Sequence, residues 1–254
     1  MLAGERQQRI VQRVEAEGFV KVQELSGEFG VSAMTVRRDI AELDHRGLVR
    51  RMRGGAASLR ARDIGYGLRE RINRREKEDI GRRAAELVGA GEVVYIDAGT
   101  TCIEVARHLV KRELAPLYLV TSSVKVSAEL AGLKGIHLTQ LGGEIYDQSF
   151  GAVGEPAVGG LARVRLDWAF LGASGVDAEL GMTNNNHVEV RVKRAALESA
   201  ERAVFLADGS KLGRASVARI VSVDEPHTLI TTAALSGDDR RRLEARGWEV
   251  IVAI

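Results

Sequence analysis

Hydrophobic residues recur every three or four positions through three short segments at the start of the chain. This spacing places them on one side of a helix, so helices are predicted over residues 5–16 and 22–29. A third helix is predicted to begin after Ser32, whose hydroxyl can accept a hydrogen bond from the first-turn amides, and to end at Gly47. The break at Gly30 forms a tight turn between the second and third helices, and this order is typical of a helix-turn-helix.

The third helix separates apolar from polar side chains. Val36, Ile40 and Leu43 lie at helical spacing and are expected to face inward. The remaining face carries a hydroxyl, a thioether and two guanidinium groups near the start of the helix. These outward residues are Met34, Thr35, Arg37 and Arg38.

A basic hairpin is predicted directly after this helix. Residues 48–52 are interpreted as a strand, and Gly54-Gly55 as the turn of a small β-wing. Residues 1–62 contain 12 Lys/Arg and 8 Asp/Glu, although the whole chain carries only +2. Such a local excess favours a polyanionic partner for this part of the chain, and a solvated basic surface is the alternative.

From about residue 76 the pattern changes to apolar runs that alternate with helical segments. The runs are 93–96, 117–120, 136–141, 168–171, 203–207, 220–223, 229–232 and 249–252, and the helical segments include 76–89, 101–112, 123–132, 187–201 and 234–246. This alternation predicts an α/β fold whose mostly parallel sheet is covered on both faces. The expected domains are a winged helix-turn-helix over 1–57, a polar, partly helical linker over 58–75 and the sheet domain over 76–254.

Composition changes this picture little. The chain has 254 residues, 45% of them hydrophobic, which fits a globular protein with a core. Cys102 is the single cysteine, so neither an intrachain disulfide nor a cysteine-rich metal site is expected, and nothing calls for a cofactor. The N-terminus lacks the apolar core of a signal peptide, and no apolar stretch approaches the roughly 20 residues of a membrane span. A cytoplasmic protein is therefore expected.

The outward face of the third helix and the wing have the chemistry that reads DNA. A helix fits the major groove, where an arginine can bind a guanine edge or a phosphate through two hydrogen bonds. The wing arginines suit phosphates, which position a protein without specifying sequence. A charged, protein-binding helical domain is the alternative, and the outward arginines and the basic wing together disfavour it. The candidate DNA-binding residues are Ser32, Met34, Thr35, Arg37, Arg38, Arg50, Arg51 and Arg53.

Five of the apolar runs are followed by loops of small and polar residues. These loops are Asp97-Ala98-Gly99-Thr100-Thr101, Thr121-Ser122-Ser123, Gly142-Gly143, Gly172-Ala173-Ser174-Gly175-Val176-Asp177 and Asp208-Gly209-Ser210-Lys211. Ligands of open α/β sheets bind beyond the carboxyl ends of the strands, so the loops are expected to meet at one edge. Amides and hydroxyls there can hold a phosphate, carboxylates can hold hydroxyls, and lysines supply positive charge. The convergence predicts a site for an anionic, hydroxyl-rich small molecule. Taken alone, Gly99-Thr100-Thr101 is more typical of a capped helix start, and Lys211 of a surface lysine.

The motif of the third helix and wing resembles the signature of DeoR-type bacterial transcriptional regulators. It consists of Thr35-Val36-Arg37-Arg38-Asp39-Ile40, then Leu43, Gly47, Leu48 and Arg51, then Gly54-Gly55-Ala56. The family usually has a histidine where this chain has Arg53, and arginine keeps a phosphate contact possible. The resemblance implies a scaffold role for Asp39, and a carboxylate so close to phosphates is expected to steer an arginine.

The resemblance also covers the sheet domain, and it implies a fold similar to sugar-phosphate isomerases that binds a phosphorylated sugar or a sugar-derived metabolite. The effector-binding residues that it implies are Lys77, Asp97, Gly99, Thr100, Thr101, Thr121, Ser122, Ser123, Gly142, Gly143, Glu189, Lys193, Asp208 and Lys211. Many members have an asparagine at or next to the position of Ser123. Taken alone, Glu189 and Lys193 are most simply a surface ion pair at i and i+4 of a helix.

These observations predict a DNA-binding transcriptional regulator, namely a repressor of a carbohydrate-metabolism operon that a phosphorylated sugar releases from its operator. A homo-oligomer, either a dimer or a tetramer, is expected because a single head reads only a short half-site. One alternative is a sugar-phosphate isomerase-like enzyme with a fused DNA-binding head, with Asp208 and Glu189 as its only evident acid–base groups. The other is an activator, or an architectural DNA binder that ignores metabolites.

Overall fold

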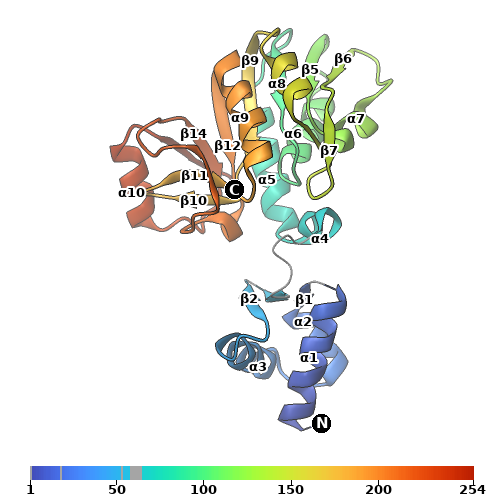
Figure 1. Ribbon diagram of the computed structural model, residues 1–254, viewed down its shortest axis with the longest axis vertical. Coiled ribbons are helices and arrows are strands. Elements are labelled where there is room, and N and C mark those ends of the chain that lie inside the picture. Colours follow the sequence, from blue (N-terminus) through green and yellow to red (C-terminus); the bar gives the residue numbers. More distant parts are fainter. Residues whose placement is uncertain (1, 18, 53, 58–64) are drawn as a thin grey trace. The chain divides into compact units, whose positions relative to one another are not determined.

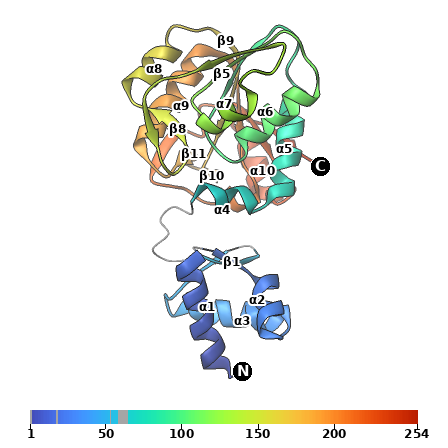
Figure 2. The ribbon, with the colours of Figure 1, turned by 90° about the vertical axis from the view of Figure 1, so that its right-hand side faces the viewer.

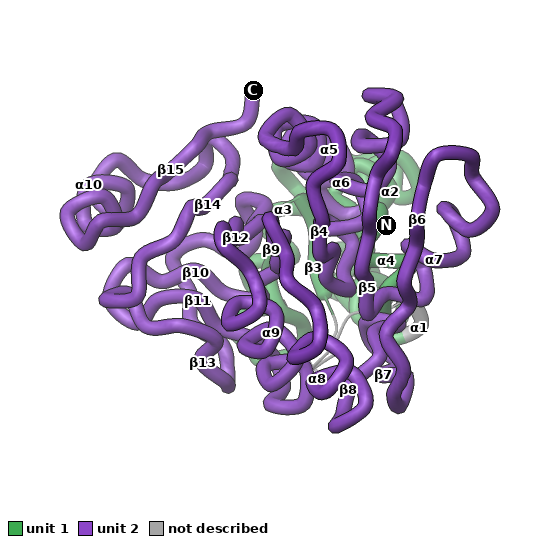
Figure 3. The backbone as a smooth tube through the Cα atoms, turned by 90° about the horizontal axis from the view of Figure 1, so that it is seen from above, with its two compact units in different colours: residues 1–71 green, residues 72–254 purple. Residues whose placement is uncertain are grey.

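The computed structural model describes residues 2–17, 19–52, 54–57 and 65–254. They form two compact units, Met1–Arg71 and Ile72–Ile254, which are coloured separately in Figure 3. The candidate Arg53 and the first part of the predicted linker, residues 58–64, lie outside the described residues.

The N-terminal unit contains the predicted helices and wing (Figure 1). Its elements are α1 (Ala3–Glu17), β1 (Phe19–Lys21), α2 (Val22–Phe29), α3 (Ala33–His45), β2 (Arg50–Met52), β3 (Gly55–Ala57) and α4 (Tyr66–Arg71). The strands form an antiparallel sheet in the order β1-β3-β2. Strand β1 was not predicted, because three residues are too few to show the alternation of a strand.

The core of this unit consists of the residues that helical spacing placed inward. Ile10 and Val14 of α1 pack with Leu25 of α2 and with Val36 and Ile40 of α3. All five are buried, and burying an aliphatic side chain of this size contributes about 1.5–3 kcal/mol. The side chains on the opposite face of α3 are thereby held in solvent.

The C-terminal unit has the predicted α/β fold (Figure 2). Its elements are α5 (Arg74–Ala85), β4 (Val93–Ile96), α6 (Cys102–Lys111), β5 (Leu117–Thr121), α7 (Val124–Leu130), β6 (Ile136–Gln140), β7 (Glu144–Tyr146), β8 (Gly151–Val153), α8 (Glu155–Leu161), β9 (Leu166–Gly172), β10 (Gly175–Asp177), β11 (Gly181–Asn184), α9 (His187–Ser199), β12 (Ala200–Leu206), a 3-10 turn (Gly209–Lys211), β13 (Ala218–Val221), β14 (Thr228–Thr231), α10 (Gly237–Ala245) and β15 (Glu249–Val252). In the described part of the chain, no helix is both long enough and apolar enough to cross a membrane.

Seven strands form the main sheet, in the order β15-β14-β12-β9-β4-β5-β6, and every neighbouring pair is parallel. The chain leaves β4 toward β5 and β6 on one side, and later returns to β9 and continues toward β12 on the other. The strand order therefore reverses between β4 and β9. In open parallel sheets, the loops at such a reversal leave room for a ligand beyond the carboxyl ends of the strands.

Alternation along the strands produces a core on each face of this sheet. Val94 and Ile96 of β4 belong to the core that α5, α6 and α7 cover, whereas Tyr95 belongs to the core that α8 and α9 cover. Successive side chains of a strand point to opposite faces, and both faces here are apolar. This double burial explains why the strands read as continuous apolar runs.

One predicted strand, β13, belongs to a different sheet from the one expected. Residues 220–223 were expected in the parallel sheet, but β13 pairs antiparallel with β11 in a separate three-stranded sheet. An apolar run shows that a strand is buried and leaves its partner undetermined, so the sequence could not distinguish the two sheets. The short strands β7, β8, β10 and β11 and the helix α8 were also not predicted.

Candidate functional site

The start of α3 is organised by Ser32. Its hydroxyl accepts a hydrogen bond from the Thr35 amide at 3.1 Å, which is the predicted N-cap, and lies 2.9 Å from the Thr35 hydroxyl. Met34, Arg37 and Arg38 are exposed, and Met34 is 68% accessible. The structure thus presents the predicted residues of the first turns of α3 to solvent, on the face opposite the core.

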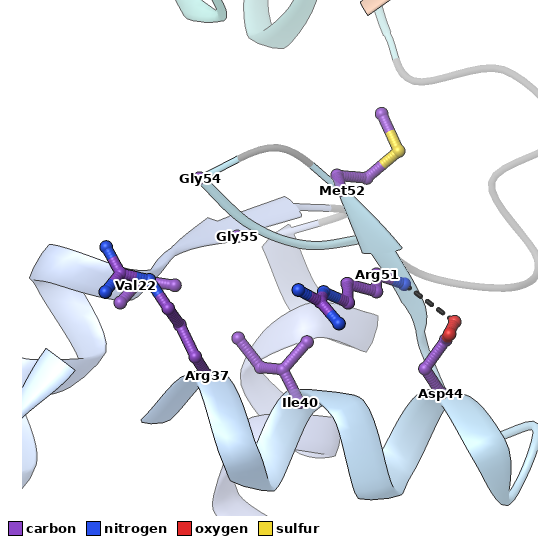
Figure 4. Close-up of a pocket in the computed structure, with 8 residues that line it drawn as sticks. All are labelled: Val22, Arg37, Ile40, Asp44, Arg51, Met52, Gly54 and Gly55. Carbon is purple, nitrogen blue, oxygen red and sulfur yellow. Dashed lines mark hydrogen bonds between the residues drawn. The ribbon is translucent and has the colours of Figure 1, made fainter. Parts of the chain in front are cut away.

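A cleft of about 560 Å³ separates α3 from the wing (Figure 4). Arg37 of α3 and Arg51 of β2 reach into this space, and Ile40 forms part of its apolar lining. The carboxylate of Asp44 accepts a hydrogen bond from the Arg51 amide at 2.8 Å, so the last turn of α3 holds the strand that carries Arg51. The lining of the cleft thus includes two guanidinium groups from different elements, which suits a polyanion.

Asp39 faces the core side of α3 and is 5% accessible. Its two oxygens accept hydrogen bonds from Nε of Arg6 at 2.5 Å and from Nη2 at 3.1 Å. This bidentate pair fixes α1 against α3. The carboxylate therefore steers an arginine of the scaffold, as predicted, and the outward arginines Arg37 and Arg38 remain separate from it.

In the C-terminal unit, the five predicted loops follow β4, β5, β6, β9 and β12, all of them strands of the parallel sheet. They therefore lie at one edge, in the order of their strands. The loops after β4 and β9 are neighbours at the point where the strand order reverses. The structure thus brings together the loop residues that the sequence singled out.

A buried ion pair occupies this reversal point. The ammonium of Lys193, from α9, donates hydrogen bonds to a carboxylate oxygen of Asp97 and to the Gly172 carbonyl, the latter at 3.0 Å. The same oxygen of Asp97 accepts the Gly172 amide at 3.0 Å. Lys193 and Asp97 are 2% and 3% accessible. Burial raises the pKa of Asp97, and the carboxylates of Asp97 and Glu189 raise the pKa of Lys193 in spite of its burial.

Glu189 lies one turn before Lys193 and is also largely withdrawn from solvent. It accepts hydrogen bonds from the side-chain amides of Asn184, at 3.0 Å, and of Asn186, while Asn186 also caps α9. Burial opposes the charged form, yet Lys193 and these amides hold the pKa of Glu189 below its ordinary value. The simple interpretation of Glu189 and Lys193 as a surface ion pair is wrong, because Lys193 is buried and bonds to Asp97.

The hydroxyls after β5 are occupied within the protein. Thr121 donates to the Ile96 carbonyl at 2.6 Å, Ser122 lies 2.9 Å from the Tyr95 hydroxyl, and Ser123 accepts the Val126 amide at 3.2 Å as the N-cap of α7. All three are buried. They shape the edge of the sheet, and each already has a partner there.

The loop after β4 lies directly before α6. Gly99 has φ of 147°, a conformation that other residues rarely adopt, while Thr100 and Thr101 lead into Cys102, the first residue of α6. The first amides of a helix have no acceptor within it, so this turn can hold an anion. Burial raises the pKa of the Cys102 thiol, which keeps this side chain neutral at physiological pH.

Gly142 and Gly143 follow β6, as predicted. Gly143 has φ of 138°, and a Cβ atom there would lie 2.2 Å from the Val153 carbonyl oxygen of β8. The close approach of residue 143 to β8 is therefore sufficient to require a glycine at this position, without any ligand.

The loop after β12 carries a carboxylate that lies near two ammonium groups. Asp208 is buried, and its carboxylate accepts the Ser210 amide and the Asn73 side-chain amide, both at 2.9 Å. Burial alone would favour the neutral acid, but the ammonium groups of Lys211 and Lys77 hold the pKa of Asp208 below its ordinary value. The two lysines predicted from distant parts of the sequence are thus neighbours of the same carboxylate.

Four polar residues at this edge were not singled out from the sequence. They are Asn73, Glu76, Asn184 and Asn186. Amides and carboxylates on polar segments carry no periodic signal, so only their three-dimensional partners show their place. Within the described residues, no group of histidine, cysteine, aspartate or glutamate side chains is arranged to hold a metal ion.

Comparison with known families gives matches to both units. Residues 6–62 match the DeoR-like helix-turn-helix domain, and residues 72–233 match the DeoR C terminal sensor domain. The chain is 37% identical to the HTH-type transcriptional regulator GlpR of Haloferax volcanii over 99% of this chain and 98% of that protein. It is 32% identical to the glycerol-3-phosphate regulon repressor of Escherichia coli strain K12, over 90% of each chain.

Among solved structures, ribose 5-phosphate isomerase A of Methanocaldococcus jannaschii matches 55% of each chain, with 19% identity and a TM-score of 0.40. A likeness of that size carries no inference about function. The curated relatives, by contrast, are named as regulators along nearly their whole length and none of those above is named as an enzyme. The chain therefore belongs to the DeoR family of transcriptional regulators, with a DeoR-like helix-turn-helix domain and a DeoR C-terminal sensor domain.

Proposed function

We propose that this protein represses a carbohydrate-metabolism operon and that a phosphorylated sugar or related metabolite releases it from the operator. Two relatives support this function by name, the glycerol-3-phosphate regulon repressor of Escherichia coli K12 and the putative aga operon transcriptional repressor of Escherichia coli O157:H7. The observation that carries the proposal is the edge of the parallel sheet, where the five loops, two lysines and a helix start meet.

The DNA-binding residues are proposed from the exposed face of α3 and from the wing. Arg37 and Arg38 stand on a helix whose opposite face is buried, so they are free to enter the major groove. Arg50 and Arg51 lie on β2, where they suit phosphates. A DNA strand in the cleft of Figure 4 would pass between Arg37 and Arg51.

The effector site is proposed at the carboxyl ends of β4, β9 and β12. The turn Gly99–Thr101 would hold the phosphate, with the positive charges of Lys77 and Lys211 nearby. Asp97, Lys193 and Glu189 would complete the site toward the sugar hydroxyls. Thr121, Ser122 and Ser123 would support this edge through their internal hydrogen bonds.

A homo-oligomer is proposed because operators are commonly two-fold symmetric and one helix-turn-helix reads only one half-site. The effector then acts by favouring an arrangement of the subunits that binds the operator less tightly. Its effect on DNA affinity can be no larger than its differential affinity for the two arrangements.

The test is a gel shift on the DNA upstream of the protein's own operon, with a panel of phosphorylated sugars as competitors. We expect a specific complex that one or more of these compounds weaken. Salt-sensitive binding without sequence preference and without response to the panel would instead indicate an architectural DNA binder, and turnover of a panel member would contradict the regulator.

Replacing Arg37 with alanine should weaken operator binding by about 1–3 kcal/mol, since one bidentate contact is lost. Arg9→Ala is the matched control, because it removes the same charge from an exposed position of α1. Fluorescence anisotropy on operator and on random DNA separates the loss of the bidentate contact from the loss of positive charge. If both variants bind the operator equally well, Arg37 does not contact DNA.

Replacing Lys211 with alanine should blunt the response to the effector while operator binding without effector stays unchanged. Lys211 is half-buried beside Asp208 and would lose its charge contribution to an anionic ligand. Titration of the effector against a preformed operator complex measures the shift. Full release of Lys211→Ala at the wild-type effector concentration would exclude Lys211 from the site.

A further inference from the structure

We propose that Asn73 and Glu76 couple the effector site to the DNA-binding unit, by tying the Asp208 loop (residues 208–211) to the Ile72 segment (residues 72–77). This inference rests on the proposed function, and it assigns a role to two residues that lie outside the proposed effector contacts. They are positioning residues, which act through the loop and through the chain that follows.

Two hydrogen bonds join the loop to the segment. The side-chain amide of Asn73 donates to the Asp208 carboxylate at 2.9 Å, and the Gly209 amide donates to the Glu76 carboxylate at 2.8 Å. They link residues 135 and 133 positions apart in the chain. Both bonds are partly buried, where water competes less with them.

The Ile72 segment is itself held in a defined conformation. Asn73 has φ of 50° and ψ of 36°, the left-handed region that asparagine tolerates better than most residues. The Lys77 ammonium donates to the Ile72 carbonyl at 2.7 Å, and the Lys77 amide bonds to the Asn73 carbonyl at 3.1 Å. The segment is therefore closed on itself by Lys77, one of the proposed effector residues.

The segment also has a fixed base. Residues 74–77 of this segment form the first turn of α5. A Cβ atom on Gly81 would lie 2.4 Å from Cβ of Glu104 on α6, so the two helices pack at close range. Because α5 is held against α6, it cannot shift to accommodate a displacement of the Asp208 loop. The displacement is passed instead to residues 72 and 73, at the start of the unit.

The chain before Ile72 is the helix α4, which belongs to the N-terminal unit. Residues 72–77 are thus the first part of the sensor unit after the covalent connection to the DNA-binding unit. An effector that binds at Lys77, Asp208 and Lys211 acts on both partners of the Asn73 and Glu76 bonds. The same contacts that hold a ligand therefore bias the conformation of the segment that leads to the DNA-binding unit.

The experiment compares operator affinity with and without saturating effector in the full-length protein. The probes are glycerol 3-phosphate, fructose 1-phosphate and ribose 5-phosphate, and the ratio of the two affinities is the coupling factor. Asn73→Gly keeps the left-handed backbone and removes the donor, while Glu76→Ala removes the acceptor. An ordinary hydrogen bond changes an equilibrium by about fivefold, and we expect each variant to lower the coupling factor by about that amount.

Three controls separate coupling from folding and from ligand binding. Glu76→Gln keeps an acceptor oxygen for the Gly209 amide and should restore the coupling that Glu76→Ala loses. Glu78 lies on the same helix, and Glu78→Ala removes an exposed ion pair with Arg74, so the coupling factor of this variant should equal that of the wild type. Calorimetry should show that Asn73→Gly binds the effector with unchanged affinity, within about threefold.

The outcomes distinguish this inference from the proposed function. If the wild type responds to a probe and the Asn73 and Glu76 variants respond equally, the coupling role is wrong and the repressor function stands. If the variants lose calorimetric binding of the probe, these residues belong to the effector site and the inference is overturned. If no probe weakens operator binding of the wild type, the proposed effector fails and the coupling role fails with it.

Discussion

Lys193→Met is expected to destabilise the sensor unit by about 3–5 kcal/mol at neutral pH. Lys193 is fully buried and is the cation that bonds to Asp97 at the point where the strand order reverses. Removal of one partner of a buried ion pair leaves the other charge without compensation, and this costs more than the pair contributes when intact. Urea unfolding, followed by a signal from the sensor unit, measures the change.

The loss should be smaller in acid. Burial already raises the pKa of Asp97. Without Lys193 only the hydrogen bond from the Gly172 amide still opposes that effect, so the folded pKa moves further above the unfolded value. A carboxyl with a raised folded pKa takes up a proton on folding. Its contribution is therefore complete below the unfolded pKa and is lost as the pH rises through the folded one. The free energy of unfolding of Lys193→Met should consequently be closest to that of the wild type at the lowest pH values measured.

Two further variants sharpen this result. The double variant Asp97→Asn with Lys193→Met removes both charges and should recover part of the lost stability, since no unpaired charge stays buried. Lys211→Met removes a half-buried ammonium from the same edge of the sheet and should cost less than 1 kcal/mol. If Lys193→Met and Lys211→Met unfold at the same urea concentration, the Asp97 pair is not a buried ion pair.

The folds of both units follow closely from hydrophobic spacing, because each long element has one dominant environment. The face of α3 that carries Val36 and Ile40 is buried, so helical spacing identified this helix. The β4 run is apolar on both sides, and its alternation with helical segments indicated a strand of a parallel sheet. The short hairpin of β7 and β8 was not predicted, since three residues per strand are too few to show a period. The pairing of β13 with β11 was not predicted either, because strand pairing depends on the whole sheet.

From the residues alone, the candidate site could be predicted only where a residue lies beside a strand end, whereas Lys77, Glu189 and Lys193 were predicted from the family resemblance. Asp97 and Asp208 directly follow β4 and β12, so the topology of a parallel sheet placed them at one edge. The partner of Lys193 could not be predicted, because helical spacing pointed to Glu189 and the bond to Asp97 spans 96 positions. Asn73 lies in the segment interpreted as linker, and only its backbone conformation and its bond to Asp208 distinguish it.

Asp39→Ala should abolish operator binding, and the sign of this effect separates a scaffold role from simple electrostatics. The substitution removes a negative charge from a unit that binds a polyanion, so electrostatics alone would strengthen DNA binding. The structure predicts the opposite. Asp39 holds the buried guanidinium of Arg6 through two hydrogen bonds, and loss of that carboxylate leaves Arg6 unpaired, at a cost of about 3 kcal/mol.

That cost is large for so small a unit, because domains of this size are only marginally stable. The matched control is Glu42→Ala, which removes the same charge from an exposed side chain one turn along α3. The Glu42 carboxylate accepts a hydrogen bond from the Gln7 side-chain amide at 2.9 Å. Glu42→Ala should bind the operator as tightly as the wild type or more tightly, whereas Asp39→Ala should show no specific complex and an early melting transition of the N-terminal unit. Tighter operator binding by Asp39→Ala would mean that α1 keeps its place on α3 without the Arg6 pair, and that the apolar contacts of Ile10 and Val14 suffice to orient the DNA-reading helix.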